Sequence, residues 1–208
     1  MNNKEMIDKA IILVSNLNIR HIVGFHEYVL QHLKTKENEI SNKINDCTRK
    51  DKKFVDLKIE RNLYAETYKN HLMINTFLML YSHLEEWLYL IWKKYGRDIE
   101  LEDSRGSISK YKPFLKGVFK MDLSKDWDWS LLIDAEKIRN CLLHANGRID
   151  LVRNRAEMDS VIKRHKTYLH MKTKRLFIHQ TLLEKLFSSI HSIIYKVETV
   201  KEVSNNFH

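Results

Sequence analysis

The stretch Leu131-Leu-Ile-Asp-Ala-Glu-Lys-Ile-Arg-Asn-Cys-Leu-Leu-His-Ala-Asn-Gly147 has the apolar periodicity of one amphipathic helix that ends in a stop. At about 100° per residue, its regularly spaced apolar side chains fall within roughly 40° of one line, as packing on a core requires. Asn146 and Gly147 follow, and both residue types enter the left-handed C-terminal cap at low cost. The stretch therefore predicts a helix over residues 127–146, capped at its start by Asp126 or Asp128. The apolar face consists of Leu131, Ala135, Ile138, Leu142 and Ala145.

Polar side chains of the same helix point away from this apolar face. Glu136, Asn140 and His144 are spaced four apart and share the opposite side, and Arg139 lies on the flank. Packing on a core does not require these polar side chains. Their presence indicates a functional surface in the last turns of the helix.

Arg139-Asn-Cys-Leu-Leu-His144, followed by Ala-Asn-Gly, resembles the HEPN superfamily (higher eukaryotes and prokaryotes nucleotide-binding domains). Its ribonuclease members carry an Arg, four to six further residues and a His late in a helix. The resemblance implies an up-and-down α-helical bundle that dimerises, with paired motifs forming a metal-independent RNA-cleaving site. It also implies that Arg139 and His144 are the catalytic pair and that Asn140 supports them. Glu136 either orients Arg139 or belongs to the helix surface.

An Arg followed after four to six residues by a His also occurs from Arg20 to His26 and from Arg164 to His170. The first pair spans Gly24 within an N-terminal helix, and the second crosses a helix end. Only the pair that begins at Arg139 has an Asn beside the Arg, an apolar stripe around it and a glycine stop behind it. We therefore place the candidate site there.

Geometry favours a second copy of this helix. Arg139 and His144 are separated by about 7.5 Å along the axis and about 140° around it, so only the reach of the arginine, or a second copy of the helix, could bring both onto one ligand. Leu132 and Leu143 also lie off the apolar face, by roughly 100–120°. Leucines beside polar catalytic groups are typical of an interface, so we expect a homodimer with a composite site.

The chemistry needs neither metal nor cofactor. Histidine titrates near neutrality and suits acid or base work, and the arginine fork matches phosphate oxygens. The eleven His are scattered, and Cys47 and Cys141 form no CxxC pair, so no metal site or disulfide framework is expected. We expect an RNA substrate, no metal and no cofactor.

Length and composition bound the fold. The chain has 208 residues, which suits one domain, and only five Gly and one Pro, which leave few turns. An all-α, up-and-down bundle of long helices follows. The expected parts of this single domain are an N-terminal helix and charged turn (1–50, turn near 45–49), a long core helix (51–95), a linker (96–106), a short helix (108–120), the motif helix (127–146), a small hairpin (168–178) and a closing helix (181–203).

The formal net charge of +9 favours a polyanionic partner. Basic residues are densest after Gly147, so we expect the RNA backbone to contact Arg148, Arg153 and Arg155. His83, Glu85 and Glu86 fall within the apolar part of the core helix. A carboxylate there either has a partner, for which Arg139 is a candidate, or lies on the one wet face of the helix.

Three functions remain open at this stage. The first is an endoribonuclease that acts as a toxin or phage-defence effector, with an antitoxin or regulatory protein as its partner. The second is a non-catalytic HEPN-like module that binds nucleotide or RNA, and the third is a helical dimerisation protein. A cytoplasmic, non-membrane location is expected, because the apolar run of residues 11–14 is too short for a signal peptide and no run approaches a membrane span.

Overall fold

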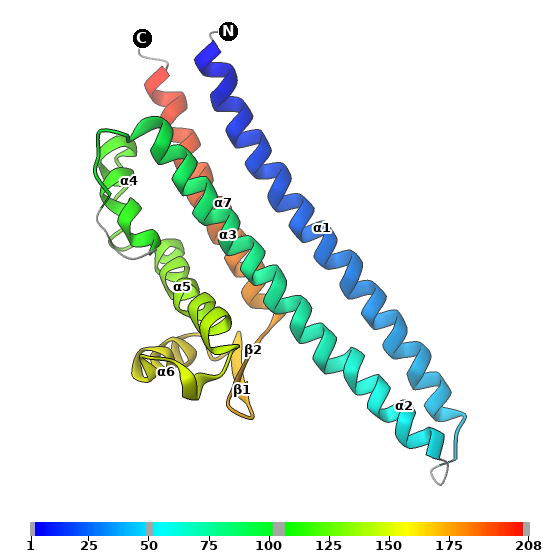
Figure 1. Cartoon of the computed structure of the whole chain (residues 1–208). Helices are drawn as coiled ribbons and strands as arrows, with labels where there is room; N and C mark the ends of the chain where they lie inside the picture. Colours follow the sequence, from blue (N-terminus) through cyan, green and yellow to red (C-terminus); the bar gives the residue numbers. More distant parts are fainter. Residues whose placement is uncertain (1–2, 49–51, 102–106, 206–208) are drawn as a thin grey trace.

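The computed structural model describes residues 3–48, 52–101 and 107–205. It is mostly helical, with long helices packed against one another and one small antiparallel hairpin, so the predicted all-α class is confirmed. The N-terminal end of α1 and the C-terminal end of α7 lie at the same end of the molecule, and the hairpin lies toward the other (Figure 1).

Two long antiparallel arms form one side of the molecule (Figure 1). Helix α1 (Asn3–Asn45) is one arm, and it continues through Gly24, where an added Cβ would meet nothing within 4 Å. The other arm comprises α2 (Lys52–Asn62), the π-helical turn η1 (Leu63–Tyr68) and α3 (Lys69–Tyr95). The long core helix expected over residues 51–95 is therefore present, interrupted by one π-helical segment.

Helix α3 is the centre of the core, because it contacts α1, α5 and α7 as well as strand β2. Its side chains are apolar on several faces, as contact with several neighbours requires. Its largest side chains that are almost completely buried are Phe77, Leu80, Tyr81, Leu84, Trp87, Leu88 and Ile91.

Two buried polar pairs join α1 to α3. The ring of His26 is 2.8 Å from the Thr76 hydroxyl, and the ring of His83 is 2.9 Å from the Ser15 hydroxyl. Burial lowers the pKa of both histidines, against a smaller opposing effect of Glu27 on His26 and of Glu86 on His83. Both rings are therefore neutral at physiological pH, and each supplies a hydrogen bond that fixes the register of the arms.

The segment after α3 turns sharply at Gly96. A Cβ at this position would lie 2.4 Å from Phe114 Cδ2, so the close approach requires glycine. The expected short helix is present as the 3-10 turn η2 (Ile108–Tyr111) and α4 (Lys112–Phe119). Residues 102–106 of the expected linker and 49–51 of the charged turn lie outside the described residues.

The motif helix is α5 (Trp127–Ala145), and it leads into η3 (Ile149–Leu151) and α6 (Arg155–Arg164), which the sequence did not define as elements. The predicted hairpin is confirmed as β1 (Leu169–Lys172) and β2 (Arg175–Ile178).

The closing helix α7 (Gln180–Asn205) packs on α5 and α3. Its Lys196 pairs with Asp126 and Asp128 at the start of α5, and Ser189 and Ser192 donate to Asp128. These contacts fix the N-terminal end of the motif helix against the closing helix.

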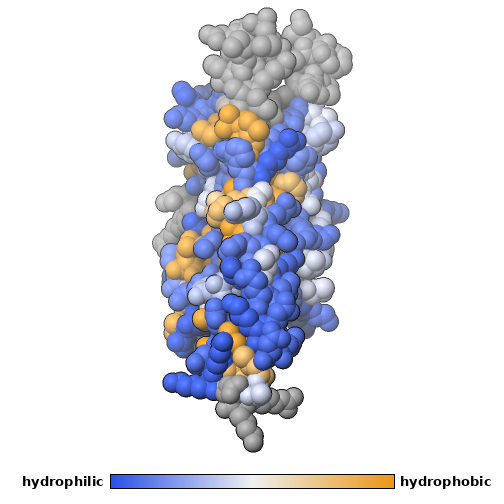
Figure 2. Space-filling model, turned by 90° about the vertical axis from the view of Figure 1, so that its right-hand side faces the viewer, coloured by the Kyte–Doolittle hydropathy of each residue, from blue (hydrophilic) through white to orange (hydrophobic). Residues whose placement is uncertain are grey.

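The face that carries α1 is mainly hydrophilic, with hydrophobic side chains in separate spots (Figure 2). Exposed hydrophobic residues of α1 include Val14, Leu17 and Phe25. Within the described ranges, no helix has an apolar stretch long enough to span a membrane.

Candidate functional site

Helix α5 carries the motif in its last two turns, and local sequence fixes both helix ends. Asp126 Oδ1 accepts a hydrogen bond from the backbone N–H of Trp129 at 2.9 Å, as the predicted N-cap should. At the other end, Asn146 and Gly147 have φ values of 49° and 71°. The helix therefore stops directly after the motif, as predicted from its Asn-Gly stop.

The buried face of α5 is wider than the sequence pattern predicts. It extends from Cys141 to Leu132, about 180° around the axis, because α5 packs against both α3 and α7. The expectation that Leu132 lies off the core is wrong, since its side chain is fully buried. Leu143 is 49% exposed, as expected. Burial also raises the pKa of the Cys141 thiol to about 11, which leaves the thiol un-ionised.

Arg139 lies at the edge of this buried face, between α5 and α3. Its Nη2 is 3.6 Å from Glu85 Oε2, and its Nη1 donates to Asn140 Oδ1 at 3.0 Å. Of the two carboxylates in the apolar part of α3, Glu85 pairs with Arg139, and Glu86 is exposed. Burial raises the pKa of Glu85, and the nearby Arg139 opposes that rise. The guanidinium is thus held between a carboxylate of α3 and the amide next to it in the motif.

Glu136 is part of a different contact. Its Oε2 accepts hydrogen bonds from the Ser107 hydroxyl at 2.7 Å and from the Ile108 backbone N–H at 3.1 Å. The Tyr81 hydroxyl donates to the same oxygen at 3.5 Å. Glu136 therefore anchors the start of η2 to α5, and the carboxylate that pairs with Arg139 is Glu85.

His144 and Asn140 lie together at a surface hollow of about 320 Å³ between α5 and the segment that precedes α6. Both side chains are exposed, and Arg153 and Leu151 line the same hollow. Asn140 therefore connects the two catalytic candidates, since it is bonded to Arg139 and shares the hollow with His144. The structure therefore places Asn140 and His144 together at the hollow, whereas Arg139 lies outside its lining, on the flank of α5 that faces Glu85.

The three arginines expected to bind RNA differ in their surroundings. Arg153 is exposed at the His144 hollow. Arg148 donates to Asp150 at 2.7 and 3.2 Å, and Arg155 donates to both carboxylate oxygens of Asp159 at 3.0 Å. Exposed pairs of this kind are worth only about 0–1 kcal/mol, so they compete weakly with a phosphate.

Sequence reasoning missed a buried ion network at Asp134. Arg164 donates to both Asp134 oxygens at 2.7 and 3.0 Å, and His165 lies 2.9 Å from one of them. Burial alone would raise the pKa of Asp134, but hydrogen bonds from His165 and Arg164 hold it well below its usual range. Asp134 lies only about 60° from the centre of the apolar face, and a carboxylate so close to a buried face needs a partner. This position could have indicated the network from the sequence.

The network also separates the candidate motif from the two other Arg-to-His spacings. Arg164 is committed to Asp134, and α6 ends at that residue. His26 of the other spacing is buried against Thr76. Both alternatives therefore contain a residue with a structural role.

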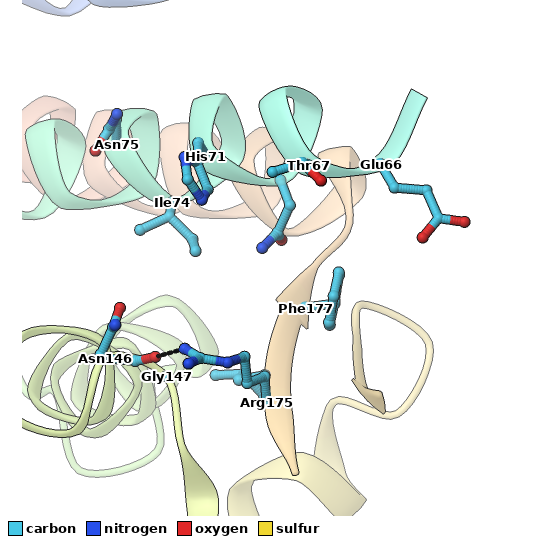
Figure 3. Close-up of a pocket in the computed structure, with 11 residues that line it drawn as sticks. Glu66, Thr67, His71, Ile74, Asn75, Asn146, Gly147, Arg175 and Phe177 are labelled. Atoms are coloured by element: carbon cyan, nitrogen blue, oxygen red, sulfur yellow. Dashed lines mark hydrogen bonds between the residues drawn. The ribbon is translucent and has the colours of Figure 1, made fainter. Parts of the chain in front are cut away.

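Two further hollows lie beside the hairpin and were not predicted. One, of about 540 Å³, lies between the start of α3, the C-terminal cap of α5 and strand β2. His71 points into it from the helix, and Arg175 extends to the Asn146 carbonyl, to which Nη1 donates at 2.9 Å (Figure 3). The second, of about 620 Å³, adjoins it and shares Glu66, Asn70 and Phe177.

No group of three or more His, Cys, Asp or Glu in residues 3–48, 52–101 and 107–205 is placed to hold a metal ion. Comparison of the chain with protein-family models, with curated proteins and with solved structures found no match.

Proposed function

We propose that this chain is a metal-independent endoribonuclease of the HEPN type, with Arg139, Asn140 and His144 at its active site. One observation carries the proposal. The Arg139 guanidinium donates to Asn140, and Asn140 lines the same exposed hollow as His144. The arginine fork, which matches phosphate oxygens, is thereby linked through Asn140 to an exposed imidazole of the same helix.

The chemistry proceeds without an additional reactant. The ribose 2′-oxygen loses its proton to a base and attacks the adjacent phosphorus. The bond to the 5′-oxygen breaks, and that oxygen receives a proton from an acid. The products are a 2′,3′-cyclic phosphate and a 5′-hydroxyl. His144 transfers one of these protons, and Arg139 stabilises the negative charge that builds on the phosphoryl oxygens.

A homodimer completes this site by supplying a second His144. Leu143 is 49% exposed next to His144, and Leu151 is 61% exposed at the same hollow. Burying such leucines against a second copy stabilises association and aligns the two motifs about a two-fold axis. Free activity of this kind would harm the host cell, which fits a toxin or phage-defence effector controlled by an antitoxin or regulatory protein.

A second candidate function is a non-catalytic module that binds RNA or nucleotide. The observation that favours it is size. The hollows beside the hairpin, at about 540 and 620 Å³, are larger than the 320 Å³ hollow at His144.

Purified protein incubated with labelled RNA tests the proposal. We expect His144→Ala and Arg139→Ala each to abolish cleavage with little loss of stability, because both side chains lie at the surface or its edge. His32→Ala, which removes an exposed histidine of α1, and Arg97→Ala, which removes an exposed arginine after α3, should cleave like the wild type. Cleavage by folded His144→Ala protein would refute the catalytic assignment.

A further inference from the structure

The two hollows beside the hairpin form one continuous depression, because Glu66, Asn70 and Phe177 line both. We call it the hairpin groove and define it by Lys69, Asn70, His71, Lys172, Arg175 and Phe177. One wall is the helical stretch that includes the π-helical turn η1, and the other is the hairpin with the cap of α5 (Figure 3). Single π-helical turns occur frequently at functional sites.

Positive charge predominates in the groove. Lys69, Lys172 and Arg175 contribute three cations, and His71 adds an imidazole. Two carboxylates also line the groove, Glu66, which pairs with Lys172, and Glu184, so the cations exceed the carboxylates by one charge. An anionic ligand is therefore favoured over a cationic one.

Arg175 has a geometry suited to phosphate. Its Nη1 donates to the carbonyl of Asn146, the residue that caps α5. This contact offsets the partial negative charge at the C-terminal end of the helix, which would otherwise repel a phosphate. A guanidinium carries five donors, so one bond to the cap is compatible with contacts to phosphate oxygens.

Asn70 lies where the two hollows meet. Among the described residues, its Oδ1 is a buried atom without a hydrogen-bond partner. A buried oxygen without a partner is destabilising, so a ligand donor that reaches it from the groove would be favoured. The amide is also a group that recognises the edge of a nucleobase.

Phe177 lies at the same junction and supplies an aromatic surface. The His170 ring stacks on it with the ring centroids 5.1 Å apart. An aromatic side chain within a row of cations is the pattern of grooves that bind single-stranded nucleic acid, where the cations contact phosphates and the ring stacks on bases.

We propose that the hairpin groove binds single-stranded RNA, with its phosphates at Arg175 and Lys172 and a base against Phe177. The RNA form of this inference rests on the proposed function, because the bound strand is the substrate of the His144 site. Asn146, the cap of α5, lines the groove and lies two residues after His144, about 3 Å along the axis and about 200° around it, so a strand that reaches both sites passes the C-terminal end of α5.

The test uses the full chain with His144→Ala, so that RNA is bound without being cut. A fluorescein-labelled 12-nucleotide RNA and, separately, AMP are the probes, measured by fluorescence anisotropy and by calorimetry. We expect His71→Ala, Arg175→Ala and Phe177→Leu each to weaken RNA binding about tenfold, the range expected for one phosphate or stacking contact. Arg175→Ala should also reduce, by about one unit, the slope of the logarithm of the binding constant against the logarithm of salt concentration.

Arg97→Ala is the matched control, because Arg97 is also exposed and also donates to a backbone carbonyl, that of Lys93. It should bind RNA like the parent. Arg175→Ala also removes a contact with α5, so thermal unfolding is measured for every variant. If Arg175→Ala does not fold, RNA binding by His71→Ala tests the groove.

The outcomes separate this inference from the proposed function. If wild-type protein cuts RNA but the parent and the groove variants bind RNA equally, the groove is not an RNA-binding site. The catalytic proposal then stands. If wild-type protein does not cut RNA, the catalytic proposal is refuted. If AMP nevertheless binds and His71→Ala removes that binding, the groove is a nucleotide-binding site. A parent that binds neither probe at millimolar concentration overturns the groove.

Discussion

The guanidinium Nη2 of Arg139 lies 3.6 Å from Oε2 of Glu85, so α3 positions the arginine that the motif of α5 supplies. The Arg139 and Glu85 side chains are 29% and 28% exposed, which leaves the guanidinium accessible from one side. A fixed arginine loses less rotamer freedom when it contacts a phosphate. Glu85 is therefore a positioning residue in the proposed site.

Glu85→Gln should slow RNA cleavage about tenfold, because a barrier increase of about 1.4 kcal/mol is expected when the arginine is no longer held. The unfolding free energy should change by less than about 1 kcal/mol, since the pair is partly exposed. Cleavage rate and urea unfolding measure the two effects. Glu86→Gln, an exposed neighbour, is the control, and an equal rate for both variants would contradict the positioning role.

Stability should fall in mild acid because of His26 and His83. Burial lowers the pKa of each in the folded protein below the value of 6.5 for an unfolded chain. The unfolded chain therefore binds protons more readily, and stability is complete above pH 6.5 and decreases as the pH falls below it. Urea unfolding at pH 7.5 and 5 checks this. The double variant His26→Leu/Thr76→Val should lose less unfolding free energy between pH 7.5 and pH 5 than the wild type. A pH dependence equal to that of the wild type would contradict the assignment to His26.

Asp134→Asn should destabilise the fold by about 2–3 kcal/mol at neutral pH, because buried hydrogen bonds to charged groups are lost. The folded-state pKa of Asp134 lies below the unfolded value of 3.8. Its contribution is therefore present above pH 3.8 and is lost as the pH falls through the folded pKa. The difference in unfolding free energy between wild type and variant should decrease in strong acid. A variant as stable as the wild type at pH 7 would show that the network contributes nothing.

Leu143→Glu should yield monomers and reduce RNA cleavage together. The side chain is 49% exposed next to His144, so a charge there should prevent burial against a second copy without disturbing the core. Mass in solution is measured beside cleavage rate. Met171→Glu, a similarly exposed apolar residue of β1, is the control. A Leu143→Glu monomer with full activity would refute the composite site.

The long helices could be predicted from sequence because each has its own apolar stripe and local stop signals. The Asn146-Gly147 stop and the Asp126 cap depend on neighbouring residues alone, and both are present. Arg139, Asn140 and His144 were selected by this local context, and the structure shows Arg139 bonded to Asn140 and Asn140 beside His144 at one hollow.

Contacts between distant segments could not be predicted in the same way. Asp134 meets Arg164, which is 30 residues away, and no periodic pattern connects them. Leu132 was expected off the core because its helix was considered alone, whereas α5 packs against both α3 and α7. The hairpin groove was missed because it joins residues near 70 to residues near 175.

The chemistry of the cut ends tests the central claim most directly. Wild-type protein is incubated with total RNA in excess chelator, and the new 3′ and 5′ ends are mapped beside His144→Ala and His32→Ala proteins. We expect 2′,3′-cyclic phosphate and 5′-hydroxyl ends with wild type and His32→Ala, and none with His144→Ala. Ends that form only when magnesium is added, or that persist in folded His144→Ala protein, would contradict it.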